Sequence, residues 1–191
     1  MAPLTGTHAL GPENATLTVR TGKTGAAAKA GHILHIEVTS WSATLDLGDD
    51  PSASLTADAR SLRVREGHGG MQSLDDGDKA NIDKTVDDEV LKGSAIAFRS
   101  SSVLVDGDRV TVAGELELGG GRGPLTFDLS VAGDGSLTGT AVVRQSDWGM
   151  KPYSTLFGTL KVVDEVEVAI EGTLGSARRT SHGETPNPER Q

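Results

Sequence analysis

The most constraining feature of this sequence is an alternation of apolar and polar residues with a period of two. Leu125, Phe127, Leu129 and Val131 occupy every second position, and similar runs recur along the chain. Successive side chains of a β-strand point to opposite faces, so such a run buries one face and leaves the other in water. The pattern therefore predicts antiparallel strands with one wet face, and it is not typical of a helical bundle.

Short turn signals divide these runs into about eight strands. Asp106-Gly107-Asp108 and Gly133-Asp134-Gly135 are two of the signals. The expected strands span residues 14–21, 31–47, 52–65, 95–105, 109–118, 124–132, 136–146 and 160–174. We expect the second strand to bend near Trp41. We also expect a bulge at Arg60-Ser61, where the apolar positions change from odd to even numbers.

One segment departs from this period and predicts a short α-helix near residues 78–91. Its apolar residues recur every fourth position and form a narrow stripe on a charged helix, made of Ile82, Val86 and Val90. Asp75 or Asp78 could cap its N-terminus. Strands and helices do not alternate elsewhere, so a parallel sheet is not predicted.

The fold class that these elements predict is all-β, with one short inserted helix. Sequential antiparallel strands close either into an up-and-down barrel or into a sandwich, and we expect an eight-stranded antiparallel up-and-down β-barrel. The 191 residues suit one domain. We expect an irregular arm at residues 1–12, the barrel domain at 13–174 and a disordered polar tail at 175–191. The interior of an eight-stranded barrel can hold one small ligand.

Charge and composition exclude several classes of function. The formal net charge of −9 argues against nucleic-acid binding and predicts repulsion from anionic membrane surfaces. The chain has no cysteine, which excludes disulfides, thiol catalysis and cysteine-ligated zinc. It shows no membrane-spanning stretch, and its N-terminus lacks the basic and apolar regions of a signal peptide, so a cytoplasmic location is expected.

The charged residues and histidines do not predict a metal site or a catalytic site. His32 and His35 lie three apart on a predicted strand, so their side chains point to opposite faces and cannot share a metal without a bulge. The acidic residues between Asp75 and Glu89 lack the spacing of a calcium loop. The sequence contains no nucleophile elbow. We therefore expect a protein that is not an enzyme and that carries no cofactor and no metal.

Aromatic residues are few, and three of the six fall within the irregular segment 148–157. Such a segment between the last two strands either lines a ligand entrance or caps the core. The residues predicted to contact a ligand are His32, Trp41, Ile82, Val86, Phe98, Phe127, Trp148, Met150, Tyr153 and Phe157. The candidates for holding a polar head group are His32, Arg99 and Arg144.

The order of several short motifs resembles the YceI family, in its actinobacterial-type branch. These motifs are the I-A-F-R-S run at 96–100, the V-T-V-A-G-E-L run at 110–116, the G-P-L-T-F run at 123–127, the R-Q-S-D-W-G run at 144–149 and the last strand at 163–171. The resemblance covers about residues 14–174. It implies a lipocalin-like barrel that holds a long isoprenoid or a similar amphipathic lipid in its lumen.

The leading functional hypothesis is therefore the binding, storage or transport of a long, polyisoprenoid-like lipid, with the helix as a lid. The alternative is a non-enzymatic structural or protein-interaction module, whose barrel is filled by Trp41, Phe98 and Phe127. The two hypotheses differ in whether the lumen is open. A homodimer is compatible with either, although the sequence contains no exposed apolar stripe that would predict one.

Overall fold

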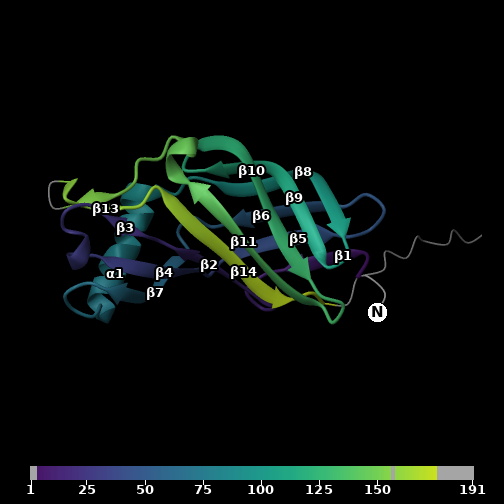
Figure 1. Cartoon of the computed structure of the whole chain (residues 1–191), viewed down its shortest axis with the longest axis horizontal. Helices are drawn as coiled ribbons and strands as arrows, with labels where there is room; N and C mark the ends of the chain where they lie inside the picture. Colours follow the sequence, from purple (N-terminus) through teal and green to yellow (C-terminus); the bar gives the residue numbers. More distant parts are fainter. Residues whose placement is uncertain (1–3, 156–157, 176–191) are drawn as a thin grey trace, which may run out of the picture.

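The computed structural model describes residues 4–155 and 158–175, and it is mostly β with one short helix (Figure 1). The main antiparallel sheet has eleven strands in the order β1-β5-β6-β8-β9-β10-β11-β14-β2-β4-β7. In chain order these strands are β1 (Thr7–Leu10), β2 (Ala15–Arg20), β4 (His32–Val38), β5 (Trp41–Asp46), β6 (Ser52–Ala57), β7 (Leu62–Gly69), β8 (Ile96–Asp106), β9 (Arg109–Leu118), β10 (Gly121–Val131), β11 (Ser136–Arg144) and β14 (Glu165–Thr173).

A second, small sheet and the helices complete the fold. The small sheet has the order β12-β13-β3 and consists of β3 (Lys23–Thr24), β12 (Ser154–Thr155) and β13 (Leu160–Val162). The helices are η1 (Ala28–Ala30), α1 (Asp76–Thr85), its π-helical continuation η2 (Val86–Val90), and η3 (Gln145–Trp148). Figure 1 shows the small sheet and α1 at one end of an elongated molecule and β1 at the other.

The expected number of eight strands is wrong, because the main sheet has eleven. The expected strands 31–47 and 52–65 are each divided in two, and β1 is added. The segment 31–47 forms β4 and β5, which are separated by Thr39 and Ser40. The bulge expected at Arg60-Ser61 is instead a turn between β6 and β7, in which Ser61 N–H donates to the Asp58 carbonyl (3.0 Å). The first residues of the expected last strand join the small sheet as β13. The up-and-down order holds from β8 to β14.

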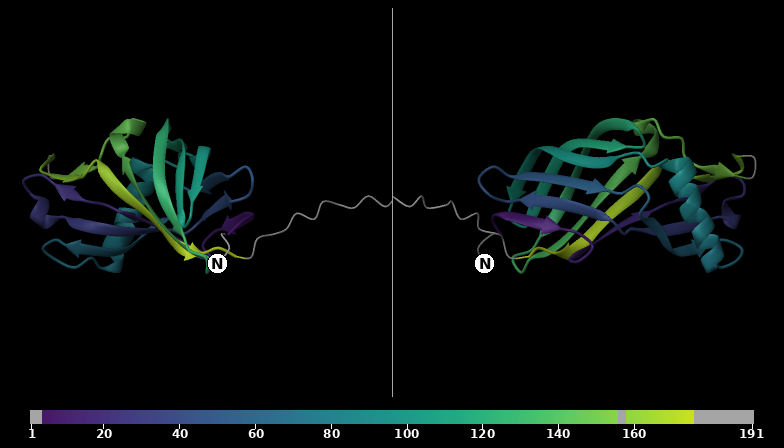
Figure 2. Two further views of the ribbon diagram at one scale, coloured as in Figure 1. Left: turned by 45° about the vertical axis from the view of Figure 1, so that its right-hand side comes forward. Right: turned by 180° about the vertical axis from the view of Figure 1, so that it is seen from behind.

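The divided strands explain how the sheet curls. β4 and β7 lie at one end of the strand order, whereas β5 and β6 lie at the other. The break between β4 and β5 faces the break between β6 and β7. Thr39 N–H donates to the Ser61 carbonyl (2.9 Å), and Asp58 N–H donates to the Ser40 carbonyl (3.0 Å). The backbone groups at this corner are thereby satisfied. The two ends of the sheet meet there, and the sheet curls around an interior (Figure 2).

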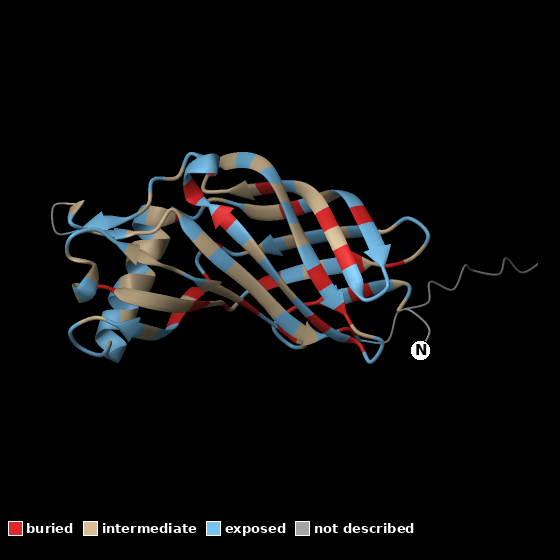
Figure 3. Cartoon of the chain, in the orientation of Figure 1, coloured by how far each residue is buried: buried red, intermediate tan, exposed pale blue. Residues whose placement is uncertain are grey.

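The predicted alternation of buried and wet faces is confirmed. On β11, Leu137 and Val143 are buried, whereas Thr138 and Val142 on the opposite face are exposed. Figure 3 shows the same alternation along neighbouring strands. Val112 on β9 is fully buried, at 0% exposure, and belongs to the continuous apolar core on the inner face of the sheet.

The predicted helix is present over 76–90, close to the expected 78–91, and it is capped as the sequence suggests. Asp75 accepts a hydrogen bond from Asp78 N–H (2.8 Å), and the Asp78 carboxylate accepts one from Asp75 N–H (3.2 Å), which forms a capping box. None of its side chains is fully buried. The carboxylate of Asp83 accepts a hydrogen bond from Val64 N–H (2.8 Å), which ties the helix to β7.

The ends of the chain differ in how far the structure describes them. Residues 1–12 were expected to be irregular, yet Thr7–Leu10 form β1, which pairs antiparallel with β5. Of the tail expected at 175–191, only the first residue is described, and the rest lies outside the described residues.

In the described part of the chain, the helices are too short or too polar to span a membrane.

Candidate ligand-binding cavity

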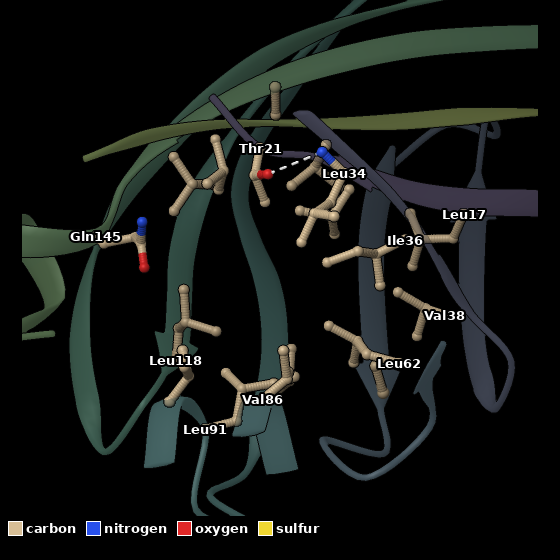
Figure 4. A pocket seen from close by; sticks show the side chains of 18 of the residues that line it. Leu17, Thr21, Leu34, Ile36, Val38, Leu62, Val86, Leu91, Leu118 and Gln145 are labelled. Atoms are coloured by element: carbon tan, nitrogen blue, oxygen red, sulfur yellow. Dashed lines mark hydrogen bonds between the residues drawn. The ribbon is translucent and has the colours of Figure 1, made fainter. Parts of the chain in front are cut away.

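A cavity of about 570 Å³ lies inside the curled sheet, between its inner face and the end formed by α1 and the small sheet. Its wall is largely aliphatic. Figure 4 shows Leu17, Ile36 and Val38 from β2 and β4 facing Leu118 from β9, with Val86 and Leu91 of the helical segment nearby. The cavity therefore extends along the inner face of several strands rather than lying between two side chains.

Many apolar residues of the wall are only partly buried although they face inward. Leu125 and Phe127 on β10 are half-buried, whereas Leu129 and Val131 further along the same face are buried. The first pair and Leu129 border the cavity, and Val131 does not. Leu125 and Phe127 therefore contact the cavity without packing fully against neighbours, whereas Leu129 reaches the wall from within the packed core.

Several polar groups of the wall lie near the small sheet. Thr21 Oγ1 accepts a hydrogen bond from Leu34 N–H (3.1 Å), and Lys23 Nζ donates to the Gly31 carbonyl (2.7 Å). Gln145 is buried, at 6% exposure, and donates through Nε2 to the Val163 carbonyl (3.2 Å). The Gln145 amide faces the lumen in Figure 4. These groups can hydrogen-bond a polar part of a ligand while most of the wall remains apolar.

The exposed wall residues at the helix end mark the opening of the cavity. Asn81 on α1 is exposed, as are Tyr153 beside β12, Thr155 on β12 and Lys161 on β13. We infer from their position that a ligand enters between α1 and the small sheet. The helical segment packs against the core through its half-buried stripe of Ile82, Val86 and Val90. This position suits a helix that covers the opening.

Seven of the predicted ligand contacts lie on the cavity wall: His32, Ile82, Val86, Phe98, Phe127, Met150 and Tyr153. The Phe98 and Phe127 rings meet at a centroid distance of 5.3 Å, from β8 and β10. The His32 Nε2 atom lies 2.7 Å from the Gln72 carbonyl oxygen, so this ring is held by the loop that precedes α1. The structure thus brings together residues that are far apart in the sequence.

The other predicted ligand contacts are not on the wall or are not described. Trp41 and Trp148 are buried in the core, and Trp148 Nε1 donates to the Leu116 carbonyl (2.7 Å). Trp148 therefore packs behind the wall, against β10, where an added Cβ at Gly121 would lie 2.2 Å from the Trp148 carbonyl oxygen. Phe157 lies outside the described residues.

Two of the three head-group candidates lie on the outer surface. Arg99 on β8 is exposed and is not part of the cavity wall. Arg144 Nη2 donates to Glu165 Oε1 (2.8 Å) on the outer face of β11 and β14, and this pair raises the pKa of Arg144. Among the polar wall residues that sequence reasoning missed are Thr21, Lys23, Gln145 and Lys161, which lie next to strands or in the short strands β3 and β13 and carry no periodic signal.

The electrostatic features of the described residues lie mainly on the outside of the sheet. Asp128 accepts hydrogen bonds from Arg109 (2.6 Å) and Thr111 (2.7 Å), which together lower the pKa of its carboxyl group.

Within residues 4–155 and 158–175, no group of three or more histidine or acidic residues is arranged to hold a metal ion. His35 packs edge-on against His68 (4.9 Å between centroids), away from His32.

Comparison with known proteins agrees with this architecture. The crystal structure of BcnA from Burkholderia cenocepacia is 17% identical, covers 82% of this chain and 94% of its own, and superposes with a TM-score of 0.57. A mutant CJ YCEI protein, whose structure has a monobromobimane guest, is 15% identical, covers 71% and 81%, and gives a TM-score of 0.49. No curated protein matches. The YceI-like domain family matches residues 11–174, and the chain belongs to this family.

Proposed function

We propose that this protein binds a long apolar or amphipathic molecule in its lumen, and that it stores or carries that molecule without transforming it. The observation that carries the proposal is the apolar cavity of about 570 Å³. Ligand sites in proteins typically have volumes of about 300–1,000 Å³ and consist of apolar walls with a few placed polar groups. The cavity has both properties.

The shape of the wall favours a chain-like ligand. Wall residues extend from Leu10 on β1 and Leu45 on β5 to Tyr153 and Lys161 at the small sheet. Burial of a methylene group contributes about 0.8 kcal/mol, so ten of them contribute about 8 kcal/mol. Association itself costs several kcal/mol of that sum. A short apolar molecule would therefore bind weakly, and a long chain is the ligand class that this lumen suits.

A polyisoprenoid is the specific ligand that we propose. The wall combines aliphatic side chains with the Phe98–Phe127 pair, which suits a branched, unsaturated hydrocarbon. The polar groups of Thr21, Lys23 and Gln145 lie toward the opening and suit a head group. The likeness to the YceI family supports the same ligand class.

The proposal is tested by asking what the purified protein carries. The full chain is extracted with organic solvent, and the extract is analysed by mass spectrometry. The delipidated protein is then titrated with a labelled long-chain prenyl alcohol and, in parallel, with a short prenyl alcohol. We expect a recovered hydrocarbon ligand, or tight binding of the long alcohol only. An empty protein that binds neither alcohol would contradict the proposal and favour the filled structural module.

A further inference from the structure

The negative charge of this chain is unevenly distributed. Residues 21–31 and 149–163 include the whole small sheet and η1, and they contain no aspartate or glutamate. The same stretches contain four lysines, namely Lys23, Lys29, Lys151 and Lys161. We call these four residues the basic rim. A chain with a net charge of −9 thus carries a positively charged unit at one end.

Among the residues that the structure describes, no ion pair neutralises the charges of the basic rim. Lys29, Lys151 and Lys161 are exposed, and Lys23 is half-buried with its Nζ donating to the Gly31 carbonyl. In the described part of the chain, every ion pair uses an arginine or a histidine instead. A carbonyl partner leaves the ammonium charge in place. The rim therefore presents free positive charge to the surroundings.

The basic rim lies where the cavity opens. β3 and β13 are hydrogen-bonded neighbours, and both Lys23 and Lys161 belong to the cavity wall. Tyr153, also on the wall, is 37% exposed in the same unit. Tyrosine is enriched at membrane–water interfaces because its ring is apolar and its hydroxyl is polar. Positive charge and an exposed aromatic ring thus lie on the small-sheet side of the opening, across from the acidic helical segment of α1 and η2.

We propose that the basic rim docks this protein on the surface of an anionic lipid bilayer, with the opening of the cavity turned toward the lipid. Each lysine near an anionic surface adds a favourable interaction, whereas charges further away than a Debye length of about 8 Å are screened at physiological salt. The lysines on the small-sheet side of the opening can therefore act on the surface independently of the acidic residues that lie further away than this length. This inference goes beyond the proposed function, and it differs from the repulsion that the net charge alone predicts.

The test measures co-sedimentation of the full chain with vesicles. One set of vesicles contains phosphatidylcholine alone, and the other contains phosphatidylcholine with phosphatidylglycerol. We expect binding to the anionic vesicles only, in about 0.1 M salt, and its loss in about 1 M salt, where the Debye length falls to about 3 Å. Equal binding to both vesicle types, or no binding to the anionic ones, would overturn the proposal.

Matched charge reversals identify the surface. Lys29→Glu/Lys151→Glu changes two exposed rim lysines, and Lys84→Glu/Lys92→Glu makes the same charge change at exposed lysines on and after the helix. The rim variant should partition at least about tenfold more weakly, because each lysine contributes about fivefold, whereas the control should bind like the wild type. Equal loss in both variants would show a non-specific charge effect and refute the assignment.

The proposed function is monitored in the same samples. Neither substituted rim residue, Lys29 or Lys151, belongs to the cavity wall. The rim variant should therefore bind the long prenyl alcohol in solution as the wild type does, with an unchanged Tm. Loss of vesicle binding with intact ligand binding supports docking through the rim. Loss of vesicle binding and ligand binding together would mean that the fold was damaged. The single variants Lys29→Gln and Lys151→Gln then decide whether vesicle binding falls while ligand binding is kept.

Discussion

The carboxylate of Asp164 accepts two hydrogen bonds from Ser146, one from the backbone N–H (2.8 Å) and one from the hydroxyl group. Gln145 N–H also donates to the Asp164 carbonyl (2.9 Å). These bonds fix η3 to the turn between β13 and β14. The same short helix carries Gln145 to the cavity wall and Trp148 into the core, so one half-buried carboxylate positions both.

Removal of this carboxylate should lower stability in a pH-dependent way. The hydrogen bond from Ser146 lowers the pKa of Asp164 from its usual value of 3.8. A carboxyl group with a lower pKa in the folded state stabilises that state above the unfolded pKa, and the contribution is lost as the pH falls through the folded pKa. Asp164→Ala should therefore have a lower Tm than the wild type at pH 7, with the difference disappearing on acidification below about pH 3.8.

Thermal unfolding followed by circular dichroism between pH 2 and 7 measures this difference. Asp147→Ala is the matched control, because Asp147 lies on the same helix and is exposed. A Tm difference for Asp164→Ala that stays constant down to the lowest pH would contradict the assigned role of the carboxylate.

Filling the lumen should abolish ligand binding without unfolding the protein. Ala53 on β6 is half-buried on the cavity wall, so Ala53→Phe places a ring in the lumen. Affinity for the long prenyl alcohol should fall at least about tenfold, which corresponds to about 1.4 kcal/mol. Ser52→Phe adds the same ring to the exposed outer face and should leave affinity unchanged. Unaltered affinity in Ala53→Phe would place the ligand elsewhere.

A tryptophan at the opening should report ligand entry. Both native tryptophans are buried behind the wall, so their emission should change little when a ligand binds. Tyr153 is exposed at the opening, and Tyr153→Trp should shift to shorter wavelength as the ligand removes water from the indole. Fluorescence titration measures the shift. A blue shift of the same size in the wild type and the variant would mean that the ligand enters near the core tryptophans instead.

Loss of the helix cap should loosen the cover of the cavity. Asp75 accepts the hydrogen bond from Asp78 N–H, and loss of such a cap costs about 1 kcal/mol. Because α1 has no fully buried side chain, Asp75→Ala should speed hydrogen exchange in 76–90 by about fivefold and leave the β-sheet amides unaffected. Asp76→Ala, one residue further on, is the control. Faster exchange throughout the sheet would show that the helix is integral to the core.

The local elements of the fold are predictable because they depend on nearby residues. The alternation in Leu125 to Val131 correctly indicates which side chains of β10 face inward. The division of the long strands is not predictable in the same way. Thr39 and Ser40 leave the sheet because their backbone bonds go to Ser61 and Asp58, and such distant partners give no local signal.

The candidate site is predictable only where it is apolar and periodic. The helix stripe of Ile82, Val86 and Val90, which follows a helical period, and the Phe98–Phe127 pair both lie on the cavity wall. The polar wall groups depend on where β3, β13 and η3 meet in space. Net charge does not reveal the basic rim for a similar reason, since it averages over a rim and a helix of opposite sign.

The most direct test of the central claim is a crystal structure of the full chain with a brominated long-chain alcohol. The anomalous signal of bromine locates the chain independently of the protein density. We expect bromine peaks inside the sheet, along the wall between Leu45 and Tyr153, with the hydroxyl group toward Gln145. Bromine peaks confined to the outer surface, with side chains closing the lumen, would contradict the account.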